Sequence, residues 1–318
     1  MPLSNLTLQG FSVWSANTDA GLRWPGLARM RSATHTRPSN LGRQIKLAWA
    51  LLGTLPHRGQ FREVLARHGH WQPVFEREVQ SFEPLVQSFM DRRSSMAQRF
   101  KHLQHDLATA THALGLATSA RIALGEQVSL WDLPGGGTVR LGLNTVSRRE
   151  GLWVLGLHHT DGLRVCQISF AFLPQAQLMI GSVQGAPAQD GQAMQAIRDL
   201  THAAEGLRPA FLLVEVLRAL CRRWDMTLVG VDPEHHVKRR WHQRRLKVAF
   251  DYCGFWAELG GSKVADGRWA IPLLRPTRDA SDVPAKRRAM HRRKMALLAA
   301  MPQQLRHLPD APVGHQVA

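Results

Sequence analysis

The stretch LWVLGLHHTDGLRVCQISFAFL, residues 152–173, contains two apolar runs separated by Asp161-Gly162. An Asp-Gly pair in this position favours a hairpin turn, because glycine readily adopts the positive φ that such turns require. Further strand-like runs lie on both sides, separated by turn residues: VSLWDL (128–133), TVRLGLNTV (138–146) and QLMIGSVQG (177–185). This pattern predicts an antiparallel meander of four or five strands.

The chain before the meander has the apolar spacing of helices. We predict helices over 41–55, over Arg58–Arg67, over 71–90 with an interruption near Pro84, and over 94–117 with Gly115 as the stop. After the meander we predict helices over 191–206 and 209–224, then strands MTLVGV (226–231) and RWAIPL (268–273).

These elements predict an α+β fold, with a helical N-terminal part followed by a mixed, mostly antiparallel sheet with helices. We divide the chain into an irregular segment 1–40, a helical region 41–125, an α+β core 126–275 and a basic tail 276–318. The tail is helix-prone around 284–300.

The composition indicates a packed globular protein with an anionic partner. Hydrophobic residues make up 44% of the 318 residues, and the formal net charge is +17. Residues 126–229 hold nine basic and nine acidic residues, whereas residues 230–318 hold 17 basic and eight acidic ones. A neutral core with basic material at its ends suits a phosphorylated cofactor, RNA or anionic lipid. The sequence leaves the oligomeric state open.

The chain shows no features of secretion or of a membrane span. The N-terminus MPLSNLTLQG has no basic segment followed by a long apolar run, and no window reaches the length of a transmembrane helix. Cys166, Cys221 and Cys253 lie far apart in apolar surroundings, which favours buried thiols in a reducing compartment. We therefore expect a cytoplasmic location.

The stretch GVDPEHHVKRRWHQRR, residues 230–245, allows three interpretations. A metal site is disfavoured, because the adjacent His235 and His236 point to different sides of any regular element. A nucleic-acid-binding helix is possible, although a basic cluster is also typical of a solvated helix face. The third interpretation is the ligand-facing rim of an α/β unit, in which His235, His236, Arg239 and Arg240 bind an anion.

The loop after the meander supports the third interpretation. In GSVQGAP, residues 181–187, a strand passes into the start of a helix, where free amides and the helix dipole favour phosphate. This order resembles the GNAT acyltransferases, in which the fourth strand opens into a loop that cradles the pyrophosphate of coenzyme A. The resemblance implies that Gln184, Gly185 and Ala186 bind coenzyme A or an acyl thioester. The second glycine of the usual loop is missing, and a plain turn is the alternative.

Two residues are candidates for acid–base chemistry. Glu215 interrupts the apolar run FLLVEVLRAL, where it either pairs with an arginine such as Arg218 or acts as a tuned acid or base. Tyr252 is the only tyrosine of the chain, and its phenol could protonate a thiolate leaving group. Alternatively, Tyr252 packs against the neighbouring aromatic side chains.

Several segments within roughly 40–300 resemble the VirK/YbjX family: GLRP (206–209), GVDPEHHV (230–237), DYCGFWAELGG (251–261) and PAKRRAMHRRKM (284–295). The resemblance implies a protein of Gram-negative bacteria associated with virulence, surface-protein expression and resistance to antimicrobial peptides. It implies no established reaction. Cys253 stands where the family has a second acidic residue. Two functions stay open: acyl transfer from a thioester, or non-enzymatic binding of RNA or anionic lipid by the basic face.

Overall fold

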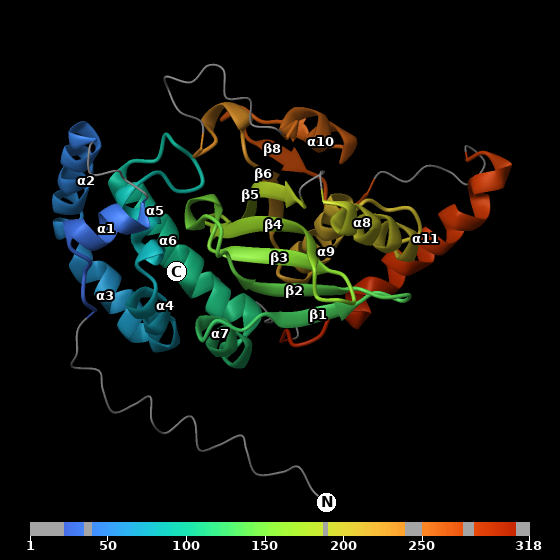
Figure 1. The fold of residues 1–318 in the computed structure, drawn as a ribbon, viewed down its shortest axis with the longest axis horizontal. Helices are drawn as coiled ribbons and strands as arrows, with labels where there is room; N and C mark the ends of the chain where they lie inside the picture. Colours follow the sequence, from blue (N-terminus) through green and yellow to red (C-terminus); the bar gives the residue numbers. More distant parts are fainter. Residues whose placement is uncertain (1–21, 35–39, 187–189, 239–249, 276–282, 310–318) are drawn as a thin grey trace, which may run out of the picture.

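The computed structural model describes residues 22–34, 40–186, 190–238, 250–275 and 283–309. In these ranges the chain forms a group of helices followed by one eight-stranded sheet, with strand order β1-β2-β3-β4-β5-β6-β8-β7. Figure 1 shows the N-terminal helices at one end of the sheet and α11 (Ala285–Gln304) at the other. The predicted α+β class is confirmed.

The first five strands form the predicted antiparallel meander. At the turn between the third and fourth strands, Gly162 has φ +87° and the carboxylate of Asp161 accepts a hydrogen bond from the backbone N–H of Leu163. The hairpin predicted from the Asp-Gly pair is thus present. The strands are β1 (Val128–Asp132), β2 (Thr138–Leu143), β3 (Trp153–His158), β4 (Arg164–Leu173) and β5 (Gln177–Gly185).

The sixth strand pairs in parallel with its neighbour, unlike the five strands before it. Helices α8 (Gly191–Ala203) and α9 (Pro209–Arg223) carry the chain over to β6 (Thr227–Gly230), which pairs in parallel with residues 177–180 of β5. The amide of Val231 still donates to the carbonyl of Ile180, after which β6 separates and β5 continues to Gly185 paired with β4 only. The sheet ends with β8 (Trp269–Ile271) and the short β7 (Ser262–Lys263).

Glycine is required where β5 leaves β6. The pairing of β4 with β5 is irregular here, and Gly181 has no partner between Ile180 and Ser182. A Cβ atom at Gly181 would lie 1.9 Å from the backbone oxygen of Glu150. The missing side chain therefore lets the short helix η4 (Arg148–Glu150) lie directly against β5.

The helical part differs from the prediction in two places. Leu27–Ala33 form α1 inside the segment predicted as irregular, because Met30 and Ala33 are buried against their neighbours. Residues 71–90 are several short helices, since Pro73 and Pro84 each open a new one. These are η2 (Gly69–Trp71), α4 (Gln72–Arg77), η3 (Val79–Phe82) and α5 (Glu83–Val86).

The longer helices were predicted well. The structure has α2 (Leu41–Gly53), α3 (Arg58–Arg67) and α6 (Met96–Leu114) close to the predicted places, whereas α7 (Leu116–Ala123), which follows Gly115, was not predicted. A capping box formed by Ser95 and Gln98 starts α6, and Gly115 with φ +75° ends it. The helix η1 (Leu55–His57) joins α2 to α3.

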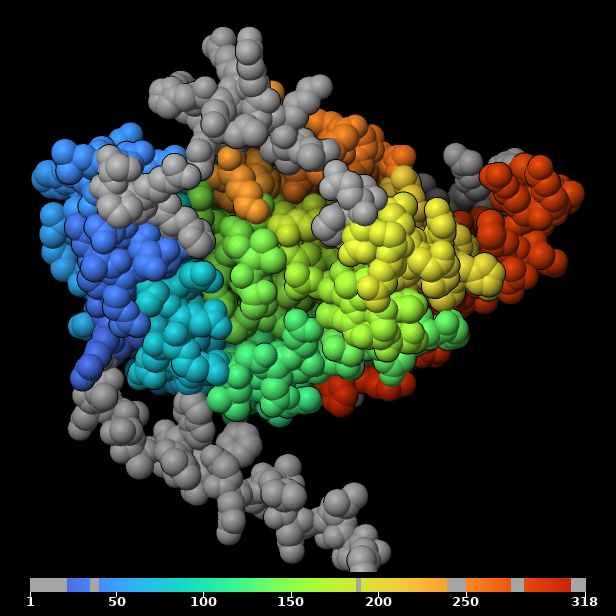
Figure 2. Space-filling view, in the orientation of Figure 1, coloured from blue at the N-terminus to red at the C-terminus, as the bar shows by residue number. Residues whose placement is uncertain are grey.

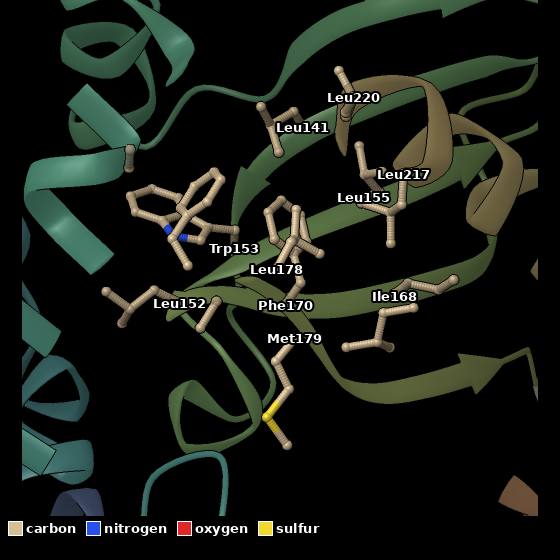
Figure 3. Close-up of a cluster of buried hydrophobic side chains, with 14 of the residues drawn as sticks. Leu141, Leu152, Trp153, Leu155, Ile168, Phe170, Leu178, Met179, Leu217 and Leu220 are labelled. Carbon is tan, nitrogen blue, oxygen red and sulfur yellow. The ribbon is translucent and has the colours of Figure 1, made fainter. Parts of the chain in front are cut away.

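A single hydrophobic core joins the sheet to the helices. Figure 3 shows Leu217 and Leu220 of α9 beside Leu155 of β3, with Phe170 and Trp153 in the same cluster. On the N-terminal side, the carboxyl group of Asp106 in α6 accepts hydrogen bonds from the indole of Trp153 and the amide of Phe172. This buried carboxyl group fastens α6 to two strands.

The predicted basic tail contains the long helix α11. Met301 and Leu305 at its C-terminal end are buried, and the helix packs against α9. Its middle also contacts the body, because Arg293 bonds to Glu205, and Figure 2 shows the N-terminal end of α11 projecting at the end opposite the N-terminal helices. The predicted helix around 284–300 is therefore present and slightly longer.

Candidate functional site at the divergence of β5 and β6

Two side chains take the place of β6 along the edge of β5. The imidazole of His236 donates from Nε2 to the carbonyl of Gly181 at 3.0 Å. The hydroxyl of Tyr252 accepts from the amide of Val183 at 3.3 Å. Polar groups that a sheet partner normally satisfies are thus satisfied by side chains instead.

Local turn chemistry brings these side chains into place. Asp232 caps the short helix η5 (Pro233–His235) by accepting from the amide of Glu234. Asp251 caps α10 (Tyr252–Glu258) by accepting from the amide of Gly254. Asp232 follows β6 and starts η5, and Asp251 starts α10; the two caps direct His236 and Tyr252 to β5.

A buried carboxylate lies at the centre of the site. Oε1 of Glu150 lies 3.3 Å from Nε2 of His236, and Oε2 lies 2.6 Å from Nζ of Lys238. The side-chain amide of Gln184 also donates to Oε2, at 3.3 Å. We call Glu150, Gln184, His236, Lys238 and Tyr252 the Glu150 cluster.

The hydrogen bonds of His236 define its tautomer. Its Nδ1 accepts from the backbone amide of Lys238 at 3.2 Å, so the ring hydrogen is on Nε2, facing Gly181 and Glu150. The ring also stacks on Tyr252, with centroids 5.6 Å apart. His236 is therefore held as an orienting group rather than as a free base.

The surroundings keep Glu150 ionised and Tyr252 protonated. Burial raises the pKa of Glu150, but hydrogen bonding from His236 and the charge of Lys238 outweigh it, so the net pKa lies below its usual range. Burial, together with the charge of Glu150, raises the pKa of the Tyr252 phenol well above its usual range. At neutral pH the site thus combines a carboxylate with a protonated phenol.

A polar chain extends from Gln184 into the sheet. Its side chain receives a hydrogen bond from the amide group of Gln167 and donates to the hydroxyl of Ser182. Ser182 bonds to the hydroxyl of Ser169, which donates to the backbone carbonyl of Glu150. This chain ties the end of β5 to η4 and holds the Glu150 backbone in place.

The predicted phosphate loop has a different structure. Gln184 and Gly185 are the last residues of β5 and pair with Gln167 and Cys166, and the amide of Ala186 donates to the carbonyl of Val165. The start of α8 is also occupied, because the carboxylate of Asp190 accepts from two of its first amides. The prediction of an open loop at Gln184–Ala186 is therefore wrong, since the ladder with β4 continues through it.

Glu215 lies in a separate contact. Its carboxylate is 2.8 Å from Nη1 of Arg218 and 3.4 Å from Nη1 of Arg275, and Arg218 donates to the carbonyl of Leu259. Of the two alternatives from the sequence, pairing with an arginine is the one observed. A catalytic role for Glu215 stays a prediction without a described contact to the Glu150 cluster.

The remaining predicted anion ligands divide into three cases. His236 joins the Glu150 cluster, whereas His235 bonds to the carboxylate of Asp232. Arg239 and Arg240 lie outside the described residues. Within the described part of the chain, no group of three or more histidine, cysteine, aspartate or glutamate side chains is placed to hold a metal ion.

The sequence did not point to Glu150, and it marked Lys238 only as one residue of the basic cluster that begins there. Glu150 lies in a turn between two strands, and its partners come from far along the chain. Because the turn sequence SRRE is rich in charge, it predicts an exposed turn. The close packing of η4 on Gly181 instead buries the Glu150 carboxylate.

We expect Glu150→Gln to lower the free energy of unfolding by about 2 kcal/mol at pH 7, because an amide cannot replace the charge that Lys238 and His236 face. The folded-state pKa of Glu150 is depressed, so its contribution is present above the ordinary pKa of 4.5 and is lost as pH falls below it. Urea unfolding should therefore show the difference shrinking from pH 7 toward pH 3. The exposed Glu126→Gln serves as the control, and equal stability of Glu150→Gln and wild type at pH 7 would contradict the prediction.

Comparison with known proteins agrees with the resemblance seen in the sequence. Residues 37–307 match the family described as protein of unknown function (DUF535). The chain belongs to this family. The matched DUF535 region contains the whole sheet and every member of the Glu150 cluster.

Curated relatives support the same assignment. An uncharacterized protein of Haemophilus influenzae is 27% identical over 249 residues, 78% of this chain and 84% of that protein. The uncharacterized protein YbjX of Escherichia coli is 25% identical over 174 residues, 53% of this chain and 52% of that protein. A protein of Mannheimia haemolytica named membrane protein LapB is 29% identical over 185 residues, 56% of this chain and 78% of that protein.

The match to YbjX confirms the VirK/YbjX family for this DUF535 protein. No solved structure matches the chain. Among the described residues, no helix combines the length and the apolar composition that crossing a membrane requires.

Proposed function

We propose that the protein transfers an acyl group from a thioester carrier, such as acyl-coenzyme A, at the divergence of β5 and β6. The observation that carries the proposal is the position of Tyr252. Its hydroxyl lies at the edge of β5 that β6 has left, bonded to the amide of Val183. A parallel strand pair that opens inside an otherwise antiparallel sheet is also the arrangement expected from the GNAT resemblance.

The chemistry requires a proton donor for the leaving thiolate. An acceptor nucleophile attacks the thioester carbonyl, the carbon–sulfur bond breaks, and the sulfur takes a proton. The phenol of Tyr252, which its raised pKa keeps protonated, gives its proton to the sulfur as the carbon–sulfur bond breaks and regains one from the attacking amine, so that no phenolate accumulates. Glu150 and His236 orient the phenol through charge and ring stacking.

The carrier would bind along the free edge of β5. To do so it would displace the hydroxyl of Tyr252 and the imidazole of His236 from the backbone groups of Val183 and Gly181. The first amides of α8 cannot bind its phosphates, because they already donate to Asp190. The phosphates would therefore need cationic side chains. Arg239 and Arg240, which follow Lys238 in the sequence, remain the predicted phosphate ligands.

Tyr252→Phe tests the proposal directly. We expect release of free coenzyme A from acetyl-coenzyme A, in the presence of a mixture of primary amines, to fall by about 10²–10⁴-fold, the usual contribution of a positioned acid. The variant also loses one hydrogen bond to Val183, which should cost about 1 kcal/mol of stability. A thiol reagent follows the release, and thermal unfolding follows the fold.

His235→Ala is the matched control, because His235 precedes the cluster but bonds to Asp232 instead. It should leave thiol release within about twofold of wild type. Coenzyme A and acetyl-coenzyme A should each raise the melting temperature of the wild-type protein. The proposal is wrong if neither compound does so, or if Tyr252→Phe releases thiol as fast as wild type.

The second candidate is RNA binding at α11. Its first half exposes Lys286, Arg287, Arg288 and Arg292, together with Arg293, which bonds to Glu205, and its N-terminal end projects from the body of the molecule (Figure 2). Such a helix can neutralise phosphates without any specific geometry. Binding there would not respond to Tyr252→Phe, so the same variant separates the two functions.

A further inference from the structure

Helix α2 presents an apolar stripe to the outside of the molecule. Trp49 is 70% exposed, Leu41 68%, Leu52 54% and Ile45 48%. Leu55, just after the helix, is 54% exposed. At about 100° per residue, the four helical positions fall within an arc of about 80°.

This stripe is separate from the face that holds α2 on the protein. Leu47 and Leu51 are the buried residues of the helix and point into the core. Single exposed leucines are common, but a row of four or five large apolar side chains on one helix face marks an interaction surface. Among the described residues the stripe stays exposed, which fits a docking face.

The charge around the stripe favours an anionic occupant. Lys46 is exposed on α2 about 60° around the helix from Trp49, and Arg62 is exposed on the adjoining α3. Residues 22–67 contain nine basic residues and a single acidic one. An apolar stripe with basic flanks and a tryptophan at its edge has the composition of helices that lie in a membrane surface.

We propose that α2 docks on an anionic lipid bilayer, with the helix in the plane of the headgroups and the stripe toward the acyl chains. The helix has 13 residues and is thus about 20 Å long, which suits surface attachment rather than crossing. The exposed cations meet the lipid phosphates. This docking rests on α2 alone and is independent of acyl transfer at Tyr252.

Vesicle flotation of the full chain tests the proposal. Vesicles of phosphatidylglycerol and phosphatidylethanolamine should carry the wild-type protein upward, whereas vesicles of phosphatidylcholine should carry much less of it. The double substitution Ile45→Ser with Trp49→Ser should weaken binding to the anionic vesicles by at least about tenfold, because it removes two of the four apolar side chains that α2 contributes to the stripe.

Leu116→Ser with Leu124→Ser is the matched control. These leucines are 54% and 51% exposed on the region of α7, away from the stripe, and their loss should leave binding within about twofold of wild type. Thermal unfolding verifies that both double variants fold. The proposal is overturned if wild type stays with neither vesicle, or if both double variants bind alike. It is also overturned if the stripe substitutions abolish self-association in sedimentation instead, which would make a second copy the occupant.

Discussion

Replacing Asp106 by alanine is expected to lower the free energy of unfolding by about 2–6 kcal/mol, because two buried donors then lose their acceptor. The indole of Trp153 donates to Oδ1 at 2.7 Å and the amide of Phe172 donates to the same oxygen at 2.8 Å. Asp106 is fully buried, so water cannot replace the carboxyl group. Urea unfolding at pH 6 measures the loss.

Asp106→Asn should cost far less at pH 6, because the amide oxygen can accept both hydrogen bonds. Burial raises the pKa of Asp106 to about 8, against opposing hydrogen bonds from Phe172 and Trp153. Oδ2 has no partner among the described residues, which agrees with a protonated carboxyl group. Wild type and the asparagine variant are then both neutral in the folded protein near pH 6.

The comparison of these two proteins predicts a pH dependence of definite sign. Between the ordinary pKa of 3.8 and the folded-state value of about 8, the folded wild type holds a proton that the unfolded chain has lost. Its stability relative to Asp106→Asn should therefore fall by about 1.4 kcal/mol per pH unit over this range, and should stay level above it. A difference that is independent of pH from 5 to 9 would contradict the raised pKa.

The control for the alanine substitution is Asp199→Ala on the exposed side of α8. Loss of this surface carboxylate should change stability by no more than about 0.5 kcal/mol. If Asp106→Ala were equally mild, the carboxyl group would not be what fastens α6 to β3 and β4.

Gly181→Ala is expected to lower the free energy of unfolding by about 2–3 kcal/mol through overpacking. The added Cβ would lie 1.9 Å from the backbone oxygen of Glu150, and backbone cannot swing aside as a flexible side chain can. Either η4 or β5 must shift. Because η4 carries Glu150 and β5 carries Gln184, the shift should also open the Glu150 cluster.

Gly185→Ala is the control on the same strand. A Cβ there has no atom within 4 Å, so stability should change by less than about 0.5 kcal/mol. Urea unfolding compares the two variants, and the rise in melting temperature with coenzyme A reports on the site. Equal stability of the two variants would show that η4 does not pack on β5 as described.

Local patterns accounted for most elements of the fold. The hairpin at Asp161-Gly162 and the helix that ends at Gly115 depend on turn and cap residues that act over a few positions, and both were predicted. In the helix predicted over 71–90, the interruption near Pro84 is present, but α4 already ends at Arg77 and α5 at Val86, so the segment forms shorter helices than predicted. The segment Leu27–Ala33 was missed because its helix depends on burial against distant residues.

Three of the residues chosen from the sequence lie together, and their roles stay predictions. Gln184, His236 and Tyr252 were chosen from the sequence, and the structure brings all three together at the edge of β5. The prediction that Gln184–Ala186 form an open loop was wrong, because pairing with β4 extends β5 through Gly185. Pairing length depends on the partner strand, which the residues of the loop do not reveal.

The sequence by itself determined the strands, the longer helices, the family and the excess of positive charge, since these depend on periodicity, turn residues and composition. Only the tertiary structure decided that Glu150 and Lys238 contact His236, and that β5 extends beyond the end of β6. Those contacts join segments far apart in the chain through one close approach at Gly181, and such long-range packing leaves no periodic mark in the amino-acid order.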